Sequence, residues 1–175
     1  MAAGNTYVAL ATNTLTTTTA SVTFSSISGS YTDLVLIVTG QGVFTLNDYL
    51  DVGIQFNGDT GSNYSTTQFR GDGVNKTSER YSSEARIRAA HIRGIVTAST
   101  EHSTFTINFM NYSNATTYKT TLSRSGTAST NASITAKVGL WRSTSAITSI
   151  LIKNDDSASG FHTGTTFSLY GIAAA

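Results

Sequence analysis

The chain has 175 residues, a formal net charge of +1 at pH 7, and neither cysteine nor proline. This length predicts one domain. Without cysteine the chain cannot form disulfides, thiolate nucleophiles or cysteine-ligated zinc sites. The weak net charge provides no long-range field for nucleic acid or anionic lipid, so we expect neither nucleic acid nor a membrane as a partner.

The composition predicts an all-β protein. The chain contains eight tyrosines, eight phenylalanines and many threonines, and these residues favour pleated surfaces. Charged residues make up only 12% of the chain, about half the usual share. A threonine-rich surface of low charge is typical of proteins that remain packed in an assembly.

The first 20 residues allow two interpretations. Thr6–Leu10 fits a short strand, whereas Thr12–Thr19 is a threonine tract whose β-branched side chains disfavour helix. Residues 1–20 are therefore either an N-terminal arm or an edge strand of the same domain. Residues 21–175 are expected to form the main domain.

The next segments carry strand patterns. Ser21–Phe24 alternates, and Leu34–Val38 is apolar throughout, which predicts a strand buried on both faces. Asp51–Phe56 alternates well, and Asn57-Gly58 then gives a strong turn signal.

The middle of the chain is less regular. Asp59–Ser83 is rich in Gly, Asn, Ser and Thr, which predicts a long loop or a loosely held hairpin. Glu84–Val96 fits a helical stripe as well as a strand alternation, and its β-rich surroundings favour a strand.

Alternation returns in the last part of the chain. Phe167 and Leu169 share one face of the terminal strand, and with Phe56 and Trp141 they are expected core anchors. About eight or nine short strands with frequent turns predict a single antiparallel β-sandwich or jelly-roll-like domain. The strands predicted here are Ser103–Met110, Tyr118–Leu122, Ile134–Trp141, Ala146–Ile152 and Gly164–Ile172, with loops at Ser123–Asn131 and Asn154–Gly160.

One segment copies a catalytic motif. Asp59–Ser62 has the sequence of the aspartic-protease nucleophile loop, a chemistry that needs two carboxylates sharing one proton. The protease loop follows an apolar strand directly, whereas the turn at Asn57-Gly58 intervenes here. This difference favours a surface turn.

The remaining ionisable residues show no catalytic or metal-binding pattern. The three histidines lie far apart and share no ligand spacing, so solvated or polar-strand positions are expected for them. The glutamates show no acid/base pairing, and turn formation explains the loop carboxylates better than calcium binding does. These residues are His91, His102, His162, Glu79, Glu84, Glu101, Asp59, Asp72, Asp155 and Asp156. We expect no enzymatic activity, no cofactor and no metal, and the sequence identifies no binding residues.

Four arginines form the densest cationic group, at positions 80, 86, 88 and 93. In a strand, Arg86 and Arg88 share a face and could bind acidic groups of a partner subunit. The solvated interpretation is favoured, because Glu79 and Glu84 neutralise part of the charge.

Three segments in a fixed order carry a family resemblance: Ser30–Val38, Val52–Ser65 and Gly139–Ile150, the third running on to the terminal strand Gly164–Ile172. Together they resemble virion structural proteins of tailed bacteriophages, of the kinds described as capsid decoration (cement), tail-fibre or minor structural proteins. The resemblance implies a β-sandwich without enzymatic activity that forms a homotrimer.

For a protein of this kind we expect a place on the outer surface of the phage particle. The short chain favours a decoration protein that binds the head where capsomer subunits meet, with the major capsid protein or other virion proteins as partners. The alternative is a tail-fibre or baseplate module that binds host surface glycan through exposed aromatic residues such as Tyr64, Tyr112 and Tyr118. An enzyme such as a depolymerase is a third and weaker class.

Overall fold

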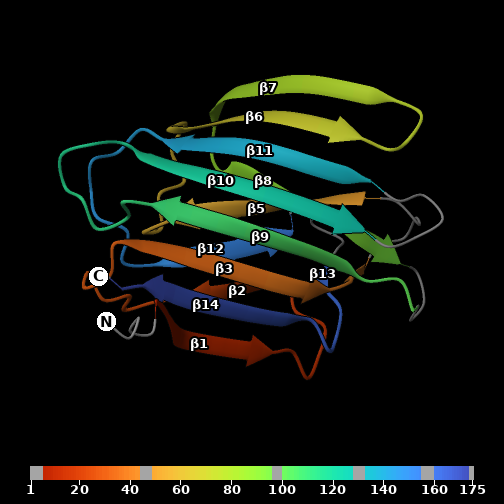
Figure 1. Ribbon diagram of the computed structural model, residues 1–175, viewed down its shortest axis with the longest axis horizontal. Coiled ribbons are helices and arrows are strands. Elements are labelled where there is room, and N and C mark those ends of the chain that lie inside the picture. The colour runs from red at the N-terminus through yellow and green to blue at the C-terminus, as the bar shows by residue number, and fades with distance from the viewer. Residues whose placement is uncertain (1–5, 44–48, 96–99, 128–132, 155–159, 174–175) are drawn as a thin grey trace.

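The computed structural model describes residues 6–43, 49–95, 100–127, 133–154 and 160–173. Over these residues the protein is an all-β structure in which two sheets pack against each other, and this confirms the predicted β-sandwich class (Figure 1). All strand pairs are antiparallel except the short pair between β4 and β8.

The larger sheet has eight strands in the order β1-β14-β3-β9-β10-β11-β6-β7, and its strands run across the front of Figure 1. Their bounds are β1 (Tyr7–Thr14), β14 (Thr166–Ile172), β3 (Asp33–Gly40), β9 (Ser103–Met110), β10 (Lys119–Thr127), β11 (Ile134–Trp141), β6 (Tyr64–Gly71) and β7 (Lys76–Glu84).

The smaller sheet has six strands in the order β13-β4-β8-β5-β12-β2 and lies behind the larger one in Figure 1. Its strands are β13 (Gly160–Phe161), β4 (Gly42–Val43), β8 (Ile87–Ile95), β5 (Tyr49–Phe56), β12 (Ile150–Asn154) and β2 (Ser21–Phe24).

The structure corrects the predicted number of strands, because the described residues form fourteen. Most of Asp59–Ser83 is not a loop but the paired hairpin of β6 and β7. The strand interpretation of Glu84–Val96 is right for β8, whose bounds are Ile87–Ile95.

Two predicted boundaries are wrong for identifiable reasons. The strand predicted to end at Leu122 continues to Thr127, because β9 and β11 pair with β10 on both sides; residues 128–131 of the predicted loop lie outside the described residues. The strand predicted from Ala146 begins only at Ile150. Before it, Thr148 and Ser149 donate their backbone N–H groups to the side chain of Asn57 rather than to a neighbouring strand.

The N-terminal segment pairs with the C-terminal strand. Tyr7–Thr14 forms β1 at the edge of the larger sheet. This strand pairs antiparallel with β14 along its length, with a register shift between Ala9 and Ala11. Leu15 is buried, and Thr19 forms an isolated bridge to Phe161.

The hydrophobic core lies between the two sheets and contains all four predicted anchors. Phe56, Trp141, Phe167 and Leu169 are buried. The Phe56 ring centre lies 5.3 Å from that of Trp141 and 5.8 Å from that of Phe109. Aromatic pairs at these separations add to the stabilisation from burial.

Candidate functional site

The larger sheet divides into two halves with opposite polarity. We call β14, β3 and β9 the regular half, and β10, β11 and β6 the inverted half. In β9 the buried residues that face the smaller sheet are apolar from Phe105 onward, as Phe105 and Ile107 show, whereas Thr104 faces outward and only Ser103 at the start of the strand is polar and buried. This is the arrangement expected for a sheet with one face on a core.

In the inverted half most buried positions are polar and several outward positions are apolar. The outward side chains of Phe69, Leu122, Ile134 and Val138 are exposed by 53%, 46%, 64% and 46%. Leu122 and Val138 are direct cross-strand partners. The buried polar residues of these strands are Thr66, Gln68, Lys119, Thr121, Ser123, Ser125, Thr127, Thr135 and Lys137.

The polar interior is explained by β8, which presents backbone groups to it. The N–H groups of Arg88, His91 and Arg93 donate to the hydroxyls of Thr66, Ser125 and Ser103 at 3.0, 3.2 and 2.8 Å, and Ser123 donates to the Ala89 carbonyl. Buried backbone groups need such partners. On one side, β8 pairs with β4 only at Gly94 and Ile95. Along the rest of that side, the hydroxyls provide the hydrogen-bond partners that a neighbouring strand would otherwise provide.

A glycine permits this close approach. A Cβ atom on Gly139 of β11 would lie 2.5 Å from Ile87 of β8 and 2.5 Å from the Thr121 hydroxyl. A larger residue at position 139 would therefore push β8 away from the hydroxyls that bind it.

A charged cluster lies beside β8, with Asp51 of β5 at its centre. Asp51 Oδ1 lies 2.9 Å from His91 Nε2 and 3.0 Å from Lys137 Nζ, while Oδ2 lies 3.0 Å from Arg88 Nη1. Burial raises the pKa of Asp51, but the hydrogen bond from His91 and the charge of Lys137 outweigh it and hold the pKa far below its ordinary value. Asp51 therefore joins β5, β8 and β11.

The same cluster determines the state of His91. Burial lowers the pKa of His91 from its ordinary value, and this effect exceeds the opposing hydrogen bond to Asp51. His91 is consequently neutral near pH 7, with Nε2 as the donor to Asp51. Of the two positions expected for the histidines, His91 takes the polar-strand one, since it is buried on β8 beside Asp51, whereas His102 is exposed and His162 is half-buried.

The arginine prediction also needs correction. Arg80 is exposed, but Arg88 lies between Asp51 and Glu84 and stacks 4.3 Å over the Tyr81 ring. Arg93 is buried and lies 5.6 Å from the Tyr49 ring centre. Two of the four arginines are therefore held by carboxylates and aromatic rings of the same chain rather than by solvent.

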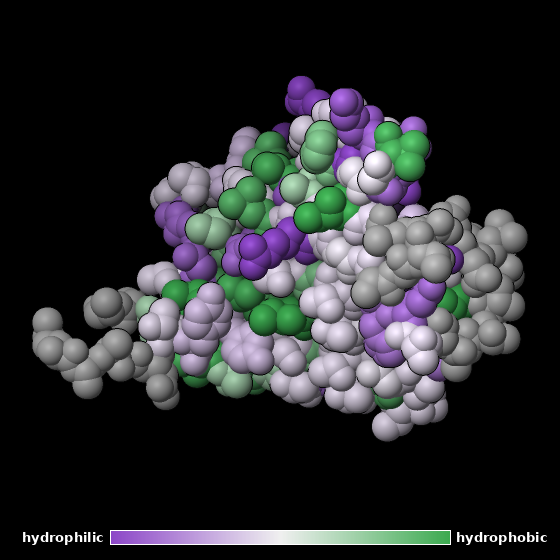
Figure 2. All heavy atoms as spheres, turned by 45° about the vertical axis from the view of Figure 1, so that its right-hand side comes forward, coloured by the Kyte–Doolittle hydropathy of each residue, from purple (hydrophilic) through white to green (hydrophobic). Residues whose placement is uncertain are grey.

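The outward face of the inverted half continues onto the edge strand β7, and this whole face, which we call the outward face of the inverted half, combines apolar and cationic side chains. In the described residues, the outward positions of β6, β7, β10 and β11 carry Lys76, Arg80 and Arg124 but no carboxylate. Figure 2 shows hydrophobic side chains gathered over the exposed face of the larger sheet, with hydrophilic ones among them. Such a surface suits contact with another macromolecule.

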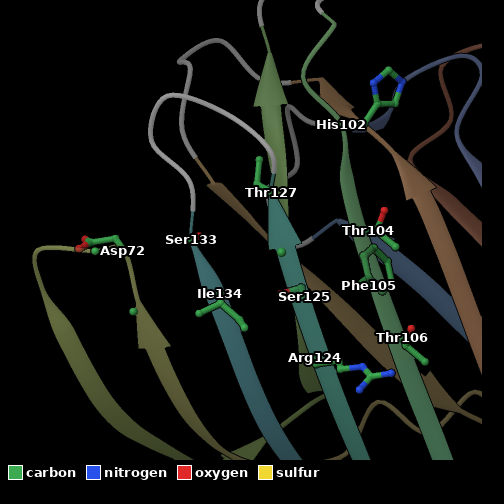
Figure 3. A pocket seen from close by; sticks show the side chains of 13 residues that line it. Asp72, His102, Thr104, Phe105, Thr106, Arg124, Ser125, Thr127, Ser133 and Ile134 are labelled. Carbon is green, nitrogen blue, oxygen red and sulfur yellow. The ribbon is translucent and has the colours of Figure 1, made fainter.

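An open depression of about 890 Å³ lies at one end of this face (Figure 3). Its wall includes Asp72, His102, Thr104, Arg124 and Ile134, and the glycines at positions 71, 73 and 126 leave it hollow. The depression continues the outward face as a hollow at the end of β6, β10 and β11.

The predicted motifs at Asp59 and Asp72 are turns. Asp59 accepts hydrogen bonds from the Gly61 N–H at 2.8 Å and from Trp141 Nε1 at 2.7 Å. Asp72 accepts the N–H groups of Val74 and Asn75 within its own turn. In the described part of the chain, no three metal-ligating side chains come together. Asp155 and Asp156 lie outside the described residues.

The prediction that three tyrosines are exposed and available to a glycan is wrong for two of them. Tyr64 and Tyr112 are fully buried, and only Tyr118 is exposed, by 56%. Tyr64 donates its hydroxyl to the Asp59 carbonyl at 3.0 Å, and burial raises the pKa of this hydroxyl to about 12. These two tyrosines serve the core.

The comparisons with known proteins add no identity. No family model matches the chain, and neither the curated proteins nor the solved structures contain a match. The described residues also include no helix long and apolar enough to cross a membrane.

Proposed function

We propose that this chain is a non-enzymatic structural protein of a tailed-phage virion, and most closely a capsid decoration (cement) protein on the outer head. The family resemblance of three segments, the last running on to the terminal strand, motivates the proposal. The observation that carries it is the outward face of the inverted half, which we propose binds the shell where capsomer subunits meet.

The exposed side chains of Leu122, Val138, Ile134 and Phe69 provide the affinity. Burying one such side chain fully stabilises an interface by about 1.5–3 kcal/mol. The cross-strand pair of Leu122 and Val138 forms the centre of the surface, because both are exposed by 46% and lie on adjacent central strands.

The charges define the partner. Lys76, Arg80 and Arg124 on this face favour a partner surface that carries carboxylates between apolar side chains. Two copies of the chain meeting through this same face would instead bring like charges together. We therefore assign the face to the major capsid protein or another virion protein, and we propose that the trimer implied by the resemblance forms elsewhere on the molecule.

The alternative function is a tail-fibre or baseplate module that binds host glycan. Of the three tyrosines expected to face a sugar, Tyr118 is exposed, but Tyr64 and Tyr112 are buried and cannot contact a glycan. The decoration function is accordingly the better supported of the two.

Copy number separates these functions. Quantitative gel densitometry of purified virions should find hundreds of copies of a decoration protein in each particle. A handful of copies would favour the fibre, and absence from the particle would contradict both. Sedimentation equilibrium of the purified chain tests the trimer, and a monomer at all concentrations would overturn it.

A further inference from the structure

Lys137 and Asp51 are placed as the two partners of an amide bond. Lys137 projects from β11, its side chain is only 1% exposed, and Nζ lies 3.0 Å from Asp51 Oδ1 on β5. The two strands belong to different sheets. A buried amine held against a carboxyl group has a very high effective concentration for reaction with it.

The geometry points to an intramolecular isopeptide bond between Lys137 Nζ and Asp51 Cγ, which forms after folding and links the two sheets covalently. The inference is independent of the proposed function, because it depends only on the interior of one chain. It goes further than the ion pair, since it assigns a covalent modification to these two residues.

The reaction is a condensation in which atoms and charge balance. The starting pair is an ammonium group and a carboxylate. One ammonium proton passes to Asp51 Oδ1, and the neutral amine then attacks Cγ to form the C–N bond. As the C–Oδ1 bond breaks, Oδ1 takes a second proton and leaves as water. The products are one neutral amide and one water molecule, so no oxidant, reductant or co-reactant is needed.

His91 and Arg88 occupy the positions that this reaction requires. His91 Nε2 lies 2.9 Å from Oδ1. In the minor fraction of chains in which His91 is protonated, Nε2 can give its proton to the leaving oxygen, which leaves a neutral ring, and then regain one from the attacking nitrogen. Arg88 Nη1 lies 3.0 Å from Oδ2, which carries the negative charge of the tetrahedral intermediate. Arg88 holds the ionised carboxylate as well, so the reaction is expected to proceed slowly from the folded state.

Lys119 provides a matched internal comparison. It is also buried, with 1% exposure, and it also lies on the inward face of the inverted half. Its Nζ donates to the carbonyls of Thr117 and Thr144 at 2.7 and 3.1 Å, so no carboxylate is bound there. Lys119 should remain unmodified.

Intact-mass spectrometry of the purified full chain under denaturing conditions is the test. After the folded protein has been held for several days, we expect its mass to be one water molecule below the sequence mass. Lys137→Arg, which keeps the positive charge, should restore the sequence mass, and Lys119→Arg should not. A tryptic digest should contain one branched peptide that joins the segments around Asp51 and Lys137.

A dehydration at Asp72-Gly73 would lose the same mass, and hydroxylamine distinguishes the two products because it cleaves a succinimide and leaves an amide intact. His91→Gln keeps a hydrogen-bond donor but removes the proton relay, and it should slow the mass loss by about 100-fold. An unmodified wild-type mass, or a mass loss that Lys137→Arg retains, would overturn the proposal.

Discussion

The regular and inverted halves of the larger sheet use the same backbone pairing but opposite side-chain chemistry. In the regular half, Phe105, Ile107 and Phe109 fill the interior, and the outward positions of β9 are polar or partly exposed. In the inverted half, serines, threonines and Lys137 face inward, while Leu122 and Val138 face solvent. Since β10 lies directly beside β9, this change occurs between two neighbouring strands.

The difference shows that the two halves are held by different forces. Apolar burial stabilises the regular half without regard to direction. The inverted half depends on directional hydrogen bonds and ion pairs, which must be satisfied one by one. The apolar residues that do not face the interior here remain available on the outside.

The largest loss of stability is expected in the regular half. Phe109 is fully buried and packs against Phe56. Phe109→Ala should lower the free energy of unfolding by about 3–5 kcal/mol, because it leaves a large cavity. Urea denaturation measures this change, and Tyr7→Ala on the exposed edge strand is the control that should change little. A small loss at Phe109 would mean that the core collapses around the gap.

Removal of Asp51 should have the next largest effect. Asp51→Ala removes the carboxylate that Lys137 and Arg88 share. The free energy of unfolding should fall by about 3 kcal/mol in the same urea measurement. Asp72→Ala, which changes an aspartate in a turn, should cost much less. Equal losses for the two variants would show that the cluster does not hold β5, β8 and β11 together.

Acid should weaken the inverted half through His91. The pKa of His91 is lower in the folded chain than its ordinary value of 6.5, so the unfolded chain binds the additional proton first. The contribution of neutral His91 to the free energy of unfolding is therefore fully present above about pH 6.5. It is lost as the pH falls below that value, by up to about 1.4 kcal/mol per pH unit. Asp51 contacts this histidine, and the charges of Lys137, Arg70 and Glu79 also act on it.

Urea denaturation at pH 7 and at pH 5.5 measures this dependence. His91→Gln should flatten the difference between the two values, because it removes the titrating group from the cluster. An unchanged difference in the variant would assign the acid sensitivity to other residues.

A single hydroxyl should have a smaller effect. Ser125→Ala removes the acceptor of the His91 N–H and a partner of Thr135, and it should lower the free energy of unfolding by about 1–2 kcal/mol. Ser78→Ala on the exposed strand β7 is the matched control. A neutral Ser125→Ala would show that water replaces the hydroxyl against β8.

The sequence predicts the strands of this fold better than it predicts the direction of their faces. Alternation locates Ser103–Met110 and Ile134–Trp141 correctly, because polar and apolar residues alternate over Thr104–Phe109 and Ile134–Val138. Alternation alone would turn Ile134 and Val138 inward, since hydrophobic residues usually face the core. They face outward because Lys137 on the opposite face binds Asp51 of another sheet.

The charged cluster was missed for a related reason. Asp51, His91 and Lys137 are far apart in the sequence and match no spacing rule, so only the sheet order brings them together. The one available signal was Lys137 itself, a lysine in the middle of a strand that ends in Leu140 and Trp141. Turn motifs such as Asp59–Ser62 were predictable because their hydrogen bonds are local.

The central claim is that the outward face of the inverted half binds the virion, and occupancy of the particle by a variant tests it most directly. The double variant Leu122→Ser, Val138→Ser should change stability by less than about 0.5 kcal/mol, because both residues are on the surface. Val74→Ser is the matched control, since Val74 is an exposed valine in the β6–β7 turn outside this face. Particles that lack the protein should bind the wild-type chain and the control, and the double variant should bind at least about tenfold more weakly. Equal occupancy by all three proteins would contradict the account.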